Sequence, residues 1–102
     1  MSGLVDKVVV VTGAAKGTGR VHCQRFADEG ADVIALDTAD FGDELHDTAT
    51  QVRDRGRRCV AASADVRDAE AMSTAIDAAV EELGRLDAVS YTHLTLPTKR
   101  IV

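Results

Sequence analysis

Short apolar runs alternate with amphipathic stretches along this 102-residue chain. The apolar runs fall at 7–12, 31–37 and 57–63, and a fourth begins at 86–90. The first run, KVVVVT, is β-branched and shows no alternation of apolar with polar residues. Such a run is typical of a parallel strand that helices cover on both faces, because that strand has no wet face for polar side chains. We therefore predict four strands.

Three amphipathic helices are predicted between these strands, at about 18–29, 43–55 and 68–83. Asp68 can cap the third helix through its carboxylate. A glycine follows each helix where a left-handed C-cap is favoured, since glycine adopts a positive φ without steric cost. The apolar residues expected on the inner faces are Val21, Phe26 and Ala27 in the first helix, Leu45, Ala49 and Val52 in the second, and Met72, Ile76, Ala79, Val80 and Leu83 in the third.

The order of these elements predicts an α/β fold, a Rossmann-type doubly wound parallel sheet truncated after strand 4. Crossovers between parallel strands are almost always right-handed, so the spatial order of the strands is expected to be 3-2-1-4. The winding then reverses beside the carboxyl end of the first strand. Ligands of such sheets bind at that point.

A glycine-rich turn of sequence GAAKGTG, residues 13–19, joins the first strand to the first helix. The first amides of a helix have no partners within it and lie at the positive end of its dipole, so they form a site for a phosphate. The spacing is Gly-x-x-x-Gly-x-Gly, and it matches neither Gly-x-Gly-x-x-Gly nor a P-loop. A tight turn without a ligand would also account for the glycines alone. The candidate cofactor-binding residues here are Gly13, Ala15, Lys16, Gly17, Thr18 and Gly19.

Asp37 ends the second predicted strand, eighteen residues after Gly19. A carboxylate there can accept hydrogen bonds from the ribose hydroxyls of a dinucleotide, and it would repel a 2′-phosphate. The alternative is an aspartate that caps a loop. Lys16 could attract the extra phosphate of NADP or could be a solvated loop lysine. Because Asp37 is present and no arginine comes directly after it, we predict NAD as the cofactor and NADP as less favoured.

Composition excludes several classes of function. The chain is 45% apolar and 28% charged, as in soluble globular proteins, and has no apolar run long enough to cross a bilayer. Its amino-terminal sequence lacks a signal-peptide layout, so we expect a cytoplasmic protein without a membrane partner. A net charge of −5 without a block of basic residues argues against a nucleic acid as binding partner. Cys23 and Cys59 lack metal-ligand spacing and are interpreted as core residues, so no metal site is predicted.

Taken together, the motifs resemble those of the short-chain dehydrogenase/reductase family. Residues 12–19, TGAAKGTG, look like its TGxxxGxG cofactor loop, and Asp37 looks like its NAD-selecting acid. Asp65 and Val66 are similar to the Asp-Val pair that contacts adenine, and residues 84–87 resemble the segment leading into strand 4. The resemblance implies an NAD-dependent oxidoreductase that transfers hydride between nicotinamide and a small-molecule alcohol or ketone. It also implies a homo-oligomer for the full-length protein.

Within the family, residues 17–22, GTGRVH, resemble the mycofactocin-coupled, carveol-dehydrogenase-like members, although the insertion usual after their second strand is absent. Family members place a catalytic tyrosine and lysine in Tyr-x-x-x-Lys spacing. Tyr91 is followed four residues later by Thr95, and Lys99 lies eight away. No catalytic residue is therefore assigned, and the chain alone is predicted to be inactive. A non-catalytic NAD-binding module is the alternative, and a methyltransferase is disfavoured by the glycine spacing.

The carboxyl-terminal residues depart from the family pattern. We interpret residues 1–89 as the N-terminal part of an NAD(P)-binding Rossmann domain and residues 90–102 as a non-native tail, since residues 89–98 resemble a translated sequencing adapter. The alternative is a polar strand and a loop, in which Thr92, Leu94 and Leu96 alternate. Truncation would leave strand 4 as an exposed edge, so we expect the isolated chain to be unstable or to aggregate, with weak NAD affinity.

Overall fold

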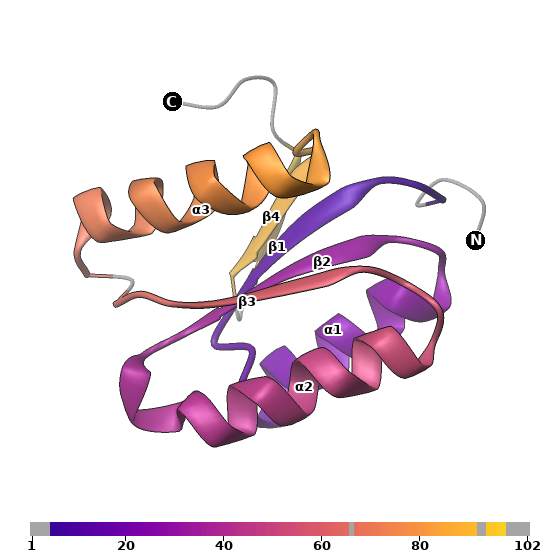
Figure 1. Ribbon diagram of the computed structural model, residues 1–102, viewed down its shortest axis with the longest axis horizontal. Coiled ribbons are helices and arrows are strands. Elements are labelled where there is room, and N and C mark those ends of the chain that lie inside the picture. The colour runs from indigo at the N-terminus through magenta and orange to yellow at the C-terminus, as the bar shows by residue number, and fades with distance from the viewer. Residues whose placement is uncertain (1–4, 66, 92–93, 98–102) are drawn as a thin grey trace.

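The computed structural model describes residues 5–65, 67–91 and 94–97, and over these residues the chain forms one five-stranded sheet with helices on both faces. In Figure 1, α1 and α2 lie on one side of the sheet and α3 lies on the other. The strand order is β3-β2-β1-β4-β5, and every pairing from β3 to β4 is parallel. The predicted order 3-2-1-4 and the doubly wound α/β fold are therefore confirmed.

The predicted helices and strands are confirmed, with ends that agree to within two residues. The elements of the structure are β1 (Val8–Thr12), α1 (Gly17–Asp28), β2 (Asp32–Asp37), the short 3₁₀-helix η2 (Ala39–Phe41), α2 (Gly42–Asp54), β3 (Cys59–Ser63), α3 (Ala69–Leu83), β4 (Ala88–Tyr91) and β5 (Leu94–Pro97). The predicted cap of α3 is also present, since the Asp68 carboxylate accepts a 3.0 Å hydrogen bond from the Ala71 amide. None of the helices in the described ranges is long and apolar enough to cross a membrane.

The expectation that β4 forms an exposed edge is wrong. Residues Leu94–Pro97 form β5, which runs antiparallel to β4 and pairs Ala88 with Pro97 and Tyr91 with Leu94. A hairpin partner satisfies main-chain groups that an edge strand would leave unpaired. The exposed edge of β4 that was expected to cause aggregation is therefore absent from the described residues. The strand expected under the alternative interpretation of this segment is thus present. Thr92, which was expected to alternate with Leu94 and Leu96 in that strand, lies outside the described residues.

The core consists of two layers separated by the sheet. Side chains of Val9 and Val11 pack toward α1 and α2, whereas those of Val8 and Val10 pack toward α3. All four valines are at most 1% exposed. Complete burial of one such side chain stabilises the fold by about 1.5 to 3 kcal/mol. Cys23 and Cys59 are free thiols buried in the first layer, as predicted for core residues.

The inner face of α1 differs from the prediction. Val21 was expected to face the core but is 44% exposed, and the buried residues of this helix are Gly19, Cys23 and Ala27. These three are spaced by four residues and so lie along one side of the helix. Because Gly19 packs directly against the preceding turn, it fixes the rotation of α1 about its axis. Val21 is thereby turned toward solvent.

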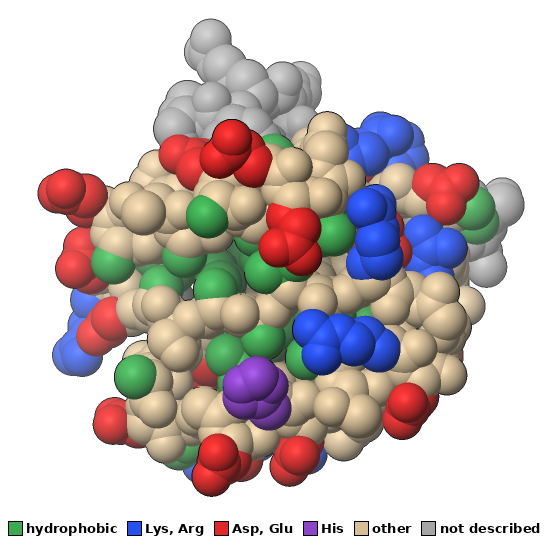
Figure 2. Space-filling model, in the orientation of Figure 1, with side chains coloured by type: hydrophobic (Ala, Val, Ile, Leu, Met, Phe, Trp, Pro, Cys, Tyr) green, Lys and Arg blue, Asp and Glu red, His purple; other side chains and the backbone are tan. Residues whose placement is uncertain are grey.

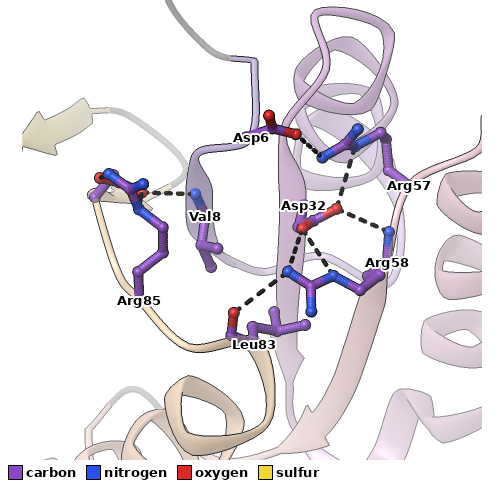
Figure 3. Close-up of polar contacts among 8 residues, drawn as sticks. Asp6, Val8, Asp32, Arg57, Arg58, Leu83 and Arg85 are labelled. Carbon is purple, nitrogen blue, oxygen red and sulfur yellow. Dashed lines mark hydrogen bonds and ion pairs between the residues drawn. The ribbon is translucent and has the colours of Figure 1, made fainter.

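A network of charged side chains closes the amino end of the sheet (Figure 3). The Asp32 side chain at the start of β2 is only 4% exposed. It accepts hydrogen bonds from the guanidinium groups of Arg57 at 3.1 Å and Arg58 at 2.8 Å, and from the Arg58 amide at 2.9 Å. Arg58 also donates to the Leu83 carbonyl that ends α3, and Arg57 donates to Asp6. The network therefore ties β2 to the amino-terminal segment and to α3.

Candidate functional site

The turn between β1 and α1 requires glycine at two positions because of its backbone conformation. Gly13 has a φ of 64° and Gly17 a φ of 61°, both in the left-handed region that other residues rarely adopt. A Cβ on Gly17 would contact no heavy atom within 4 Å, so space is not the reason for glycine there. The two glycines let the chain leave the carboxyl end of β1 and enter a helix within a few residues.

Gly19 is required because of a close contact. A Cβ at this position would lie 1.9 Å from the carbonyl oxygen of Gly13 and 2.5 Å from its carbonyl carbon. No side chain can occupy that space unless the backbone moves. Glycine at this position therefore brings the first turn of α1 directly against the residues that precede it, and this fixes where the helix begins.

The amino terminus of α1 is open to an anion. Its cap residue, Lys16, makes no side-chain hydrogen bond to the helix, and the first turn contains no acidic residue. The other two α-helices of the described chain differ, since Asp43 and Glu44 lie in the first turn of α2 and Glu70 in that of α3. Acidic residues there compensate the positive end of the helix dipole. In α1 the helix dipole and the unpaired amides remain available to a negatively charged ligand.

The structure brings Asp37 to this turn, as the sequence predicted. Its carboxylate accepts a hydrogen bond of 2.9 Å from the Ala15 amide and one of 2.8 Å from the Thr38 amide. The adjacent Ala14 amide donates to the Leu36 carbonyl at 3.0 Å. The glycine turn and the end of β2 are therefore directly bonded, and an acidic group lies beside the open helix terminus.

Lys16 is exposed at the edge of the turn, and its ammonium group lies 4.0 Å from the centre of the Phe41 ring. A cation over an aromatic face is attracted by the negative charge of the ring's π system. Phe41 ends η2 and was not predicted to belong to the site. Its only signal in the sequence is an aromatic residue shortly after Asp37, which does not reveal that its ring meets Lys16.

Asp65 follows β3 at the same end of the sheet. The Ala64 amide donates to the Asp37 carbonyl at 2.9 Å, so the segment after β3 lies beside the end of β2. Hydrogen bonds from the Arg67 side chain and amide lower the pKa of the Asp65 carboxyl to about 2. Asp65 is therefore ionised at neutral pH. Val66, its predicted partner in contacting adenine, lies outside the described residues.

The comparisons identify the family. The short chain dehydrogenase model matches residues 7–92, and this chain belongs to that family of oxidoreductases, as its motifs predicted. It is 44% identical over 100 residues to (-)-trans-carveol dehydrogenase of Rhodococcus erythropolis, with 88% of this chain and 36% of that protein covered. It is 39% identical over 87 residues to the oxidoreductase UcpA of Escherichia coli, covering 85% of this chain and 32% of that protein.

Solved structures give the same result. The fold matches that of carveol dehydrogenase from Mycobacterium avium in complex with NAD, with a TM-score of 0.81 and 43% identity over 87% of this chain and 36% of that one. It also matches a short chain dehydrogenase from Mycobacterium paratuberculosis bound to NAD, with a TM-score of 0.79 and 39% identity over 84% of this chain and 36% of that one. This chain thus spans about a third of the length of these relatives.

Proposed function

We propose that this chain is the cofactor-binding part of an NAD-dependent oxidoreductase that transfers hydride between nicotinamide and a small-molecule alcohol or ketone. The observation that carries the proposal is the acid-free amino terminus of α1, which Gly19 holds against the turn and which lies beside the Asp37 carboxylate. NAD, when bound, supplies the nicotinamide ring that accepts or donates the hydride. The NAD-bound structures of relatives support this assignment.

The residues present fit a dinucleotide. Amides of Gly17, Thr18 and Gly19 open α1 and would donate to the pyrophosphate, because they lack partners within the helix. The Asp37 carboxylate uses its oxygens on two amides, but each carboxylate oxygen has a second lone pair for a ribose hydroxyl. We assign adenine contact to Asp65 and Val66, which follow the neighbouring strand, and count Gly13, Ala15 and Lys16 as members of the turn that surrounds the phosphates.

We further propose that NAD is preferred over NADP. A 2′-phosphate would have to approach the negative charge of Asp37, which repels it. Lys16 could offset that repulsion, but its ammonium group is directed onto the Phe41 ring. The ammonium group thus already has a partner. Moving it toward a 2′-phosphate would break the cation–π contact with Phe41, which contributes about 0.5 to 1 kcal/mol at an exposed site.

The test is a titration of the chain with NAD and with NADP, followed by NMR so that millimolar affinities are measurable. We expect NAD to bind more tightly than NADP. Asp37→Asn is expected to weaken NAD binding about tenfold and to reduce the preference, because a hydrogen bond to a charged group contributes about 1.5 to 3 kcal/mol. Asp40→Asn is the control, since it removes the same charge from an exposed residue of η2. Tighter binding of NADP by the wild type would refute the preference, and no binding of either would refute the function.

We also propose that residues 90–102 are not native to this protein and that the catalytic residues lie in a part of the enzyme that this chain lacks. The family match ends at residue 92 and the chain spans 36% of its carveol dehydrogenase relative. Sequencing the source DNA downstream of Asp87 tests both statements. We expect a longer reading frame that contains Tyr-x-x-x-Lys. Finding the same tail would refute its foreign origin, and a longer frame without Tyr-x-x-x-Lys would favour the NAD-binding module.

A further inference from the structure

Thr48 of α2 holds the glycine turn from the side opposite β2. Its side chain is completely buried, and its hydroxyl donates a 2.8 Å hydrogen bond to the carbonyl oxygen of Ala14. The Ala15 carbonyl lies farther away, at 3.3 Å. Thr48 lies 34 residues from Ala14 in sequence and carries no motif signal. Only the packing of α2 against α1 brings it there.

Arg20 directs the Thr48 hydroxyl toward the turn. A threonine within a helix commonly bonds back to the carbonyl four residues earlier, and the Glu44 carbonyl lies 3.2 Å from the Thr48 hydroxyl. One nitrogen of the Arg20 guanidinium donates to that Glu44 carbonyl at 2.7 Å, and another donates to the Thr48 oxygen at 2.9 Å. The hydroxyl has one proton, and with Arg20 in these positions the Ala14 carbonyl is the nearest acceptor left to it.

The two alanines of the turn are consequently held from both sides. On the β2 side, the Ala14 and Ala15 amides donate to the Leu36 carbonyl and to the Asp37 carboxylate. On the α2 side, the Ala14 carbonyl accepts from Thr48. Only Lys16 separates these residues from the amides that open α1. Fixing their peptide groups therefore fixes the direction of the donors that follow.

We propose that Thr48 and Arg20 are positioning residues of the dinucleotide site. They hold the backbone of the turn in its binding conformation before the ligand arrives, so binding does not have to order it. The inference rests on the proposed function, since it concerns the same phosphate site. Neither residue needs to touch the dinucleotide, and both act through the Ala14 carbonyl.

A second polar pair between the same helices provides the matched control. Gln24 of α1 donates to Gln51 of α2, about one turn farther along each helix than Arg20 and Thr48. This pair bridges α1 and α2 but does not contact the glycine turn. A variant such as Gln51→Leu therefore removes an interhelical hydrogen bond and leaves the turn as it is.

The experiment measures NAD affinity and unfolding free energy of the 102-residue chain in parallel. Thr48→Val keeps the side-chain shape and removes the hydroxyl, and we expect it to weaken NAD binding about tenfold. Thr48→Ser keeps the hydroxyl and is expected to stay within threefold of the wild type, and Arg20→Met is expected to lose several-fold. Gln51→Leu should lower stability and leave affinity unchanged. A folded Thr48→Val variant that binds NAD like the wild type would overturn the inference.

Amide hydrogen exchange without nucleotide tests the same inference independently. We expect the Ala15 amide to exchange at least tenfold faster in Thr48→Val than in the wild type, while the Val10 amide in β1 is unchanged. If the wild type binds no dinucleotide, the proposed function fails, and this exchange measurement still decides whether Thr48 orders the turn. Equal protection of Ala15 in both proteins would overturn the positioning role.

Discussion

The two ends of this sheet differ in whether their polar groups are hydrogen-bonded within the protein. At the amino end, the buried Asp32 carboxylate is bonded by Arg57 and Arg58, and those arginines bond further groups of the chain (Figure 3). At the carboxyl end, the amides that open α1 have neither a side-chain cap nor an acid in the first turn. The first arrangement satisfies its charges internally and contributes to stability. The second leaves its donors for a ligand, so function is expected there.

The surface shows a further asymmetry. Figure 2 shows apolar side chains gathered in a hollow between α3 and the edge strand β3, with acidic side chains above it and to its left and basic side chains to its right. A pocket of about 450 Å³ at the amino-terminal half of α3 is lined by Ser63, Asp68, Glu70, Ala71, Thr74 and Ala75. Carboxylates in this lining disfavour an anionic ligand, unlike the amino terminus of α1. We therefore place the proposed phosphate site at the amino terminus of α1 and not in this pocket.

We expect the largest effect on stability and NAD affinity from a substitution in the glycine turn at the carboxyl end of the sheet. Gly19→Ala places a methyl group 1.9 Å from the Gly13 carbonyl oxygen, so the turn or the helix has to move. Overpacking of this kind costs about 3 kcal/mol when backbone atoms are the obstacle. We expect that loss of unfolding free energy in a urea titration, together with at least tenfold weaker NAD binding by NMR titration.

Gly42→Ala is the matched control for this substitution. Gly42 begins α2 with helical dihedral angles, and a Cβ there would meet no heavy atom within 4 Å. Alanine is favoured over glycine in a helix by up to about 1 kcal/mol, so stability should stay equal or rise. Equal effects of the two substitutions would show that the contact of Gly19 with the turn is not what matters.

We expect a smaller loss of stability from a substitution in the charged network at the amino end of the sheet. Asp32→Asn removes the charge that faces Arg57 and Arg58, whose side chains are 23% and 61% exposed and can turn toward water. We therefore expect a loss of about 2 kcal/mol, below the 3 to 5 kcal/mol typical of a fully buried pair. NAD affinity should change less than twofold, because the network lies at the opposite end of the sheet.

The exposed ion pair of Arg55 with Asp28 is the control for that experiment. The Asp28 side chain is 59% exposed, and such pairs contribute about 0 to 1 kcal/mol. Asp28→Asn should thus lower the unfolding free energy by about 0.5 kcal/mol at most. A larger loss for Asp28→Asn than for Asp32→Asn would contradict the distinction between buried and exposed charges.

We expect the smallest effect to be the loss of stability at acid pH. Burial raises the pKa of Asp32, but hydrogen bonds from the Arg58 amide and side chain and the charges of Arg57 and Arg58 outweigh it, and the pKa is lowered. Burial likewise raises the pKa of Asp87, and bonds from the Arg85 side chain and the Val8 amide reverse this. A lowered folded pKa gives stability that is present above the unfolded value of about 3.9 and is lost as pH falls below it.

Urea midpoints between pH 7 and pH 3 test this direction. We expect the stability of the wild type to fall below about pH 4, because Asp32 and Asp87 take up protons in the unfolded state at a higher pH than in the folded state. The difference between the wild type and Asp32→Asn should shrink over the same range, because proton uptake by Asp32 in the unfolded wild type favours unfolding and the variant has no such group. A difference that stays constant to pH 3 would contradict the role of the Asp32 charge.

Sequence reasoning predicted the site unevenly, and particular residues show why. Gly13, Gly17 and Gly19 were found because a left-handed turn and a close contact restrict these positions to glycine. Phe41 and Thr48 were missed because common residue types carry no signal of a partner 25 or more residues away. Val21 was misplaced because apolar periodicity alone does not fix the rotation of a helix.

The amino-acid sequence alone determined the order of strands and helices, the strand order 3-2-1-4 and the positions of Gly19 and Asp37 at one end of the sheet. Backbone sterics, the period of apolar residues and the handedness of crossovers act locally and can be read from it. Only the tertiary structure decided that Arg57 and Arg58 reach Asp32, that Thr48 and Arg20 hold the turn, and that β5 covers β4. Those contacts depend on how rigid elements pack, and long-range packing leaves no periodic trace in the sequence.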